Sequence, residues 1–200
     1  NYINPSQTKT FTTRQGQQRN IWNDWLKRQN EQIARSREDS IEWHRQHRKA
    51  MPFWVVVEAW DFGTASKYFE ILKDSHRNRI SARLGLTNAK VLKEWLQEIN
   101  TLRNRCAHHS RIWNQVSTNP LPTVPNAPYF QNLALDTNAT SRLYGLIAIL
   151  WYLVKAIGAN SQWIHQVADV IDSKPAVPGC PFSALGFPDE TGFPRKLFGI

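Results

Sequence analysis

The spacing of apolar residues along the chain predicts a succession of helices. Residues 18–49 are polar, with an apolar side chain every three or four positions, which predicts one or two exposed amphipathic helices. After Pro52, the residues Phe53, Val56 and Trp60 follow at helical spacing and predict a buried helix. Gly63 should end that helix, and Thr64 should cap the next one.

Three further helices follow in the second half of the chain. The first begins with Thr87 or Asn88 as its cap and extends to about Trp113. Ser141–Ile157 is apolar nearly all round, as in a central buried helix, and Ser161 can cap an amphipathic helix that ends near Ile171. No convincing strand pair or internal repeat is evident, so the predicted fold class is all-α.

Proline content divides the chain into segments. Residues 1–17 are polar and without a helical period, and residues 18–173 form the predicted helical domain. Within that domain, residues 117–136 contain four prolines and predict an irregular loop beside the end of the preceding helix. Residues 174–200 contain five further prolines and should form an extended tail that packs through Phe182, Leu185 and Phe187.

Composition narrows the class of protein. The net charge of +9 favours a polyanionic partner, most simply nucleic acid. Two cysteines make no disulfide scaffold or metal-binding spacing, so we expect a cytoplasmic protein without a metal or other cofactor. The longest uncharged apolar run, Leu143–Val154, is shorter than the roughly 18–20 residues of a membrane span.

The densest group of reactive side chains lies in Leu102–Asn114. On a helix, Asn104 and His108 are four positions apart, so the amide can orient the imidazole. Arg103 lies about 140° round the helix axis from His108. A histidine suits proton transfer and an arginine suits a phosphate, so together they suit cleavage of RNA by its own 2′-hydroxyl, without a metal.

Structural, noncatalytic interpretations also apply to this segment. The same group is compatible with a hydrogen-bonded structural cluster. We expect His109, the secondary catalytic candidate, to lie buried near the edge of the apolar face, and Cys106 to pack in the core as a small apolar residue. Four arginines are candidates for binding RNA: Arg105, Arg111, Arg77 and Arg79.

The segment L-R-N-x-C-A-H-H-S-R-I-W-N at 102–114 resembles the signature of the Abi-like abortive-infection proteins, the AbiD/AbiF group of the HEPN superfamily. Residues 58–68 are similar to a second motif of that family, and Leu185–Pro188 to its closing motif. The resemblance implies a HEPN-like helical bundle that cleaves RNA through Arg103, Asn104 and His108, without metal. It also implies that motifs from two protomers or two domains face each other.

The chain departs from the family pattern at two points. Asp61 occupies a position where a serine is usual, and we expect this change to matter little. The helical region that precedes Asn1 in family members has no counterpart here, which predicts a piece of a longer protein or a separately encoded chain.

Three functions are therefore open. The first is a toxin-like endoribonuclease of antiphage defence, which acts as a homodimer or together with its missing N-terminal half. An antitoxin is a candidate partner, and whether an antitoxin or a small RNA restrains the enzyme stays open. The second is a noncatalytic RNA-binding or assembly module, and the third is a structural fragment that needs its missing half.

Overall fold

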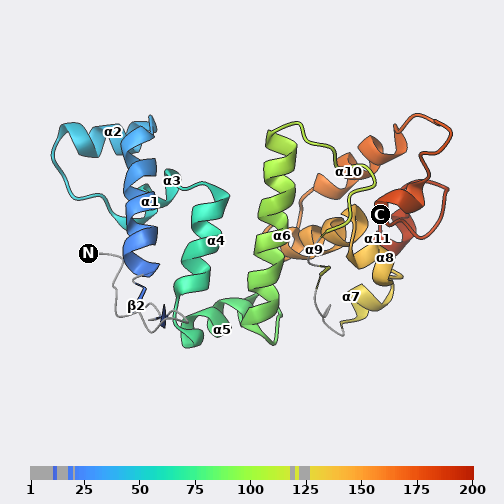
Figure 1. Cartoon of the computed structure of the whole chain (residues 1–200), viewed down its shortest axis with the longest axis horizontal. Coiled ribbons are helices and arrows are strands. Elements are labelled where there is room, and N and C mark those ends of the chain that lie inside the picture. The colour runs from blue at the N-terminus through green and yellow to red at the C-terminus, as the bar shows by residue number, and fades with distance from the viewer. Residues whose placement is uncertain (1–10, 13–17, 20, 118–119, 122–126) are drawn as a thin grey trace. The chain divides into compact units, whose positions relative to one another are not determined.

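The computed structural model describes residues 11–12, 18–19, 21–117, 120–121 and 127–200, and the regular structure of these residues is predominantly helical (Figure 1). They cluster into two compact units, residues 1–80 and 81–200. The predicted all-α class is confirmed. The division falls inside the region that the sequence predicts as one helical domain, 18–173.

The first unit begins with the two-residue strands β1 (Phe11–Thr12) and β2 (Gln18–Arg19), which pair antiparallel. This pair was not predicted, and it is too short to change the fold class. Helices α1 (Ile21–Arg35) and α2 (Asp39–Gln46) follow, and they are the two amphipathic helices expected over 18–49. Then come α3 (Phe53–Glu58), α4 (Phe62–Ile71) and α5 (Asp74–Arg83), which crosses the boundary between the units.

An aromatic cluster forms the core of the first unit, where α1 packs on α4. The ring of Trp25 lies 5.2 Å from that of Trp60 and 5.1 Å from that of Tyr68, measured between centroids. The Trp25 indole N–H also donates a hydrogen bond to the Thr64 carbonyl at 3.1 Å. Because Trp25 is almost fully buried, this bond satisfies its polar atom and fixes the position of α1 along α4.

The N-cap of α4 differs from the predicted one. Asp61, not Thr64, is the N-cap, and its Oδ1 accepts from the Thr64 N–H at 2.6 Å. Gly63 therefore lies inside the helix. Asp61 Oδ2 also accepts from Arg28 Nη2 at 3.1 Å. Asp and Ser are equally good N-caps, so an aspartate at this usual serine position keeps the capping function.

The second unit is organised around α6 (Ala89–Ala107) and α9 (Leu143–Ile157), which pack together. Between them in the sequence are the short helices α7 (Pro128–Gln131) and α8 (Thr137–Thr140). After α9 come α10 (Trp163–Asp172), the 3-10 helix η2 (Phe182–Leu185) and α11 (Arg195–Phe198). Asn88 caps α6, as the sequence predicts. The N-cap of α10 is Gln162 rather than the predicted Ser161, although Ser161 Oγ, one residue earlier, accepts from the Trp163 N–H at 3.3 Å.

The two proline-rich segments contain more regular structure than expected. In 117–136, Pro128 occupies the first turn of α7, where its missing N–H costs no hydrogen bond. Part of this loop, 118–119 and 122–126, lies outside the described residues, as do residues 1–10 and 13–17 of the predicted N-terminal segment. The tail over 174–200 forms η2 and α11, and it packs through buried Leu185 and Phe187, with Phe182 half-buried.

The cap at Asp61 gives a first prediction. Replacing Asp61 by Ala removes the acceptor for the Thr64 N–H, so the free energy of unfolding should fall by about 1 kcal/mol. Asp61→Ser, which restores an acceptor, should recover most of that loss. Urea denaturation of the three proteins measures the difference, and equal losses in both variants would contradict the assigned cap.

Asp61 also makes the stability of the first unit depend on pH. Burial acts to raise the pKa of Asp61, but hydrogen bonds from Thr64, Gln32 and Arg28 outweigh it and lower that pKa to about 2. The stability contributed by the charged form is present above the unfolded pKa and is lost as the pH falls from about 4 to 2. The free energy of unfolding of Asp61→Asn should therefore fall less over this pH range than that of the wild type. Asp39→Asn, at an exposed site on α2, is the control.

Candidate functional site

The reactive segment follows the last turns of α6, where the buried face of that helix ends. Leu92, Trp95 and Ile99 are buried and form the face that packs in the core. Leu102, one turn later, is only half-buried. Cys106 is exposed, which corrects its predicted place in the core. The final turn of α6 thus extends beyond the elements that cover its earlier turns.

Helix α6 ends at Ala107, not near Trp113 as predicted. The His109 N–H donates to the Cys106 carbonyl at 3.2 Å, and the Ser110 N–H donates to the Arg105 carbonyl at 2.8 Å. These two bonds define a Schellman motif, in which the residue after the C-cap adopts a left-handed conformation. That residue is His109, with φ of 50°. His109 is exposed, so the prediction of a buried, hydrogen-bonded histidine is wrong.

A second left-handed residue, Asn114, closes the segment that follows, with φ of 46°. Its side-chain oxygen accepts from Arg142 Nη1 at 2.7 Å. Arg142 also donates to the Ala184 carbonyl at 2.9 Å and to Asn138 Oδ1 at 2.6 Å. Arg142, which sequence analysis missed, therefore anchors residues 110–114 to α8 and η2.

The three predicted catalytic residues lie together on the last turn of α6 and its cap. Arg103 is exposed, and its Nη1 donates to Asn104 Oδ1 at 3.2 Å. His108 is the exposed C-cap residue, and its backbone N–H donates to the Asn104 carbonyl. Among the described residues, the His108 imidazole makes no hydrogen bond. The structure therefore pairs Asn104 with Arg103, whereas the sequence predicted that Asn104 orients His108.

The four arginines predicted to bind RNA fall into different parts of the chain. Arg77 and Arg79 belong to the first unit, and Arg105 and Arg111 belong to the second. The Arg77 side chain is only 13% exposed and forms an ion pair with Asp74, so it is poorly placed to contact RNA. Arg79 and Arg111 are exposed, and Arg105 is half-buried.

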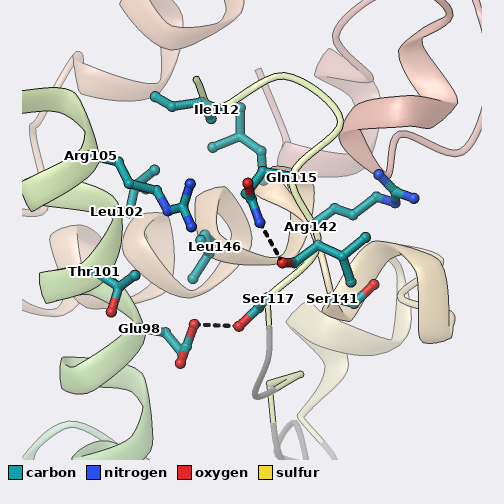
Figure 2. A pocket seen from close by; sticks show the side chains of 12 residues that line it. Glu98, Thr101, Leu102, Arg105, Ile112, Gln115, Ser117, Ser141, Arg142 and Leu146 are labelled. Atoms are coloured by element: carbon teal, nitrogen blue, oxygen red, sulfur yellow. Dashed lines mark hydrogen bonds between the residues drawn. The ribbon is translucent and has the colours of Figure 1, made fainter. Parts of the chain in front are cut away.

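A pocket of about 120 Å³ lies beside the end of α6, under residues 112–117 (Figure 2). Glu98 and Arg105 point into it from α6, and Leu102, Ile112 and Leu146 supply apolar walls. Glu98 is 8% exposed, and its Oε2 accepts from the Ser117 hydroxyl at 2.6 Å. Arg105 Nη1 donates to the Arg111 carbonyl at 3.3 Å. Sequence analysis missed Glu98, although a carboxylate within the apolar face of a helix is a readable signal.

The described residues form neither a metal-binding cluster nor a helix that could span a membrane. No three histidine, cysteine, aspartate or glutamate side chains lie close enough there to hold a metal ion. Likewise, no helix in the described part of the chain is long and apolar enough to cross a membrane.

Comparison with known families gives one match. The family model described as Abi-like protein matches residues 1–114, which is more than half of the chain. The chain belongs to the Abi-like family. The match ends at Asn114, so it includes the last turn of α6, the Schellman motif and the segment anchored by Arg142. Comparisons with curated proteins and with solved structures gave no match. Membership of the Abi-like family suggests a role in abortive-infection defence.

The left-handed residue at the end of α6 gives a prediction about stability. Glycine adopts this conformation without steric cost, so His109→Gly should raise the free energy of unfolding by about 0.5–1 kcal/mol. His108 has φ of −98°, so His108→Gly should lower it instead. Urea denaturation of both variants tests the assignment, and it fails if the two substitutions act in the same direction.

Proposed function

We propose that this Abi-like protein is a metal-independent endoribonuclease of abortive-infection defence. The observation that carries the proposal is the grouping of exposed Arg103, half-buried Asn104 and exposed His108 on one helix turn and its cap. An imidazole for proton transfer and a guanidinium for a phosphate are the two groups that cleavage by a ribose 2′-hydroxyl requires.

The proposed reaction is a transfer within the RNA strand. The 2′-oxygen attacks the adjacent phosphorus while the bond from phosphorus to the 5′-oxygen breaks. His108 takes the proton from the 2′-hydroxyl and returns it to the leaving 5′-oxygen, so no proton is gained or lost. Arg103 binds the phosphate and stabilises the charge that develops on it. The products are a 2′,3′-cyclic phosphate and a 5′-hydroxyl.

Asn104 has a different role from the one that the sequence predicts. Because its side-chain oxygen accepts from Arg103 Nη1, it holds the guanidinium and leaves the imidazole to other partners. Arg103 and His108 also lie about 140° apart round α6. We infer from this angle that the guanidinium of one copy serves the imidazole of a second copy.

A noncatalytic RNA-binding module is the second candidate. The unpartnered imidazole favours it, since an Arg103–Asn104 pair alone is sufficient to bind a phosphate. In that case Arg103→Ala weakens RNA binding, and His108→Ala changes neither binding nor the RNA.

Cleavage in the presence of a chelator separates these two functions. With EDTA, the wild type should convert RNA to fragments that end in 2′,3′-cyclic phosphates, and His108→Ala should be slower by about 100-fold or more. His165→Ala, which removes an exposed histidine from α10, is the matched control and should retain full activity. Cleavage that requires an added metal, or that persists in His108→Ala, would overturn the proposal.

A mixture of two inactive variants tests the contribution of a second copy. Arg103→Ala and His108→Ala should each be inactive alone. Mixed in equal amounts and allowed to exchange, they should recover about one quarter of wild-type activity, because half of the dimers are mixed and each has one intact site. Absence of recovery, with mixed dimers demonstrated by differently tagged copies, would contradict the shared site.

A further inference from the structure

The pocket beside α6 contains two charged groups with few partners. Among the described residues, Glu98 accepts one hydrogen bond, from Ser117, and Arg105 donates one, to the Arg111 carbonyl. Within the described residues, neither forms an ion pair. A buried carboxylate is costly unless several donors compensate for its lost water, and one hydroxyl is a small compensation. The pocket therefore favours a ligand that brings further donors to Glu98.

The remaining walls restrict the shape of that ligand. Leu102, Ile112 and Leu146 supply apolar walls, and in Figure 2 Leu146 lies between the Glu98 carboxylate and the Arg105 guanidinium. Arg142 also lines the pocket, but three hydrogen bonds to Asn114, Asn138 and Ala184 occupy its guanidinium, which points away from the centre (Figure 2). A flat ligand with donors at one edge and acceptors at another fits these walls.

The two charged groups distinguish among planar ligands. A phosphate or another anion is disfavoured by the Glu98 carboxylate, and a cation is disfavoured by Arg105. Among the RNA bases, guanine alone presents two adjacent donors, N1–H and the 2-amino group, that match both oxygens of a carboxylate. It also carries O6 and N7, the acceptors that arginine binds most often.

We propose that this pocket binds a guanine base of the RNA, with Glu98 accepting from N1–H and the 2-amino group and Arg105 donating to O6 or N7. The assignment of the base to RNA rests on the proposed function. Glu98, Leu102 and Arg105 share a face of α6, and His108 lies about 60° from Arg105 round the helix axis. A guanine in the pocket would therefore place its own strand near His108.

Binding of mononucleotides to the full chain tests the pocket without any cleavage. By isothermal titration calorimetry, 5′-GMP should bind the wild type. Inosine 5′-monophosphate, which lacks only the 2-amino group, should bind about tenfold more weakly, because one donor to the buried carboxylate is lost. Adenosine 5′-monophosphate, which lacks the N1–H and O6, should bind more weakly still.

Two substitutions test the assigned contacts. Glu98→Gln should abolish the preference for 5′-GMP over inosine 5′-monophosphate, and Arg105→Gln should weaken both ligands by about tenfold or more. Glu94→Gln, one turn earlier on α6 and paired with Lys90, is the matched control and should leave the preference intact. Equal affinity of the wild type for the three nucleotides, or no binding of 5′-GMP, would overturn the proposal whatever the variants do.

These measurements distinguish a failure of the guanine pocket from a failure of the proposed nuclease function. If 5′-GMP binds selectively and RNA is not cleaved, the pocket stands and the nuclease proposal fails. If RNA is cleaved and 5′-GMP does not bind, the nuclease stands and the guanine pocket fails. Where both hold, mapped cleavage sites should lie next to guanines for the wild type and lose that preference in Glu98→Gln.

Discussion

The ending of α6 at Ala107 is the constraint on which the site depends. Because His109 adopts a left-handed conformation, the chain leaves the helix axis there and crosses the pocket as residues 110–117. A non-glycine residue in this conformation costs roughly 1–2 kcal/mol, and Asn114 adds a second such cost. The Schellman bonds and the contacts of Arg142 offset these costs. The reactive segment is therefore held by hydrogen bonds rather than by continued helix.

The C-terminal part of α6 carries two groups of side chains. Arg103 and the cap residue His108 are exposed and lie about 140° apart round the axis, whereas Glu98 and Arg105 point into the pocket. In nucleic-acid recognition, phosphate contacts set position and affinity, whereas base contacts carry sequence information. In the proposed complex, α6 would serve both tasks, because a rotation of about 100° per residue directs the two groups of side chains to different sides of the helix.

The sequence was sufficient for the helices but not for the way they end. Periodicity located α6 and α9, and Asn88 marks the start of α6 because its side chain accepts a backbone N–H bond. The segment around His109 contains neither Gly nor Pro, so no local signal indicates the end of α6, and the predicted burial of His109 failed for that reason. Cys106 lies within the helix, and its exposure depends on which elements cover the last turn, which periodicity does not show. Asp61 was likewise missed as a cap because Thr64, three positions later, is an equally plausible cap. The second copy that the proposed function requires is not readable from one chain.

Glu98 links stability to function in this unit. A side chain 8% exposed beside Trp95 and Ile99 would contribute more to folding as leucine or methionine, since a buried carboxylate with one hydroxyl partner is a net cost. A ligand that supplies two donors removes that cost only in the folded state, so its binding stabilises the second unit in proportion to its affinity. With the proposed ligand, the second unit would thus be least stable when the pocket is empty. Because Ile112 and Gln115 to Ser117 line the pocket, the same ligand would also contact the segment that follows His108.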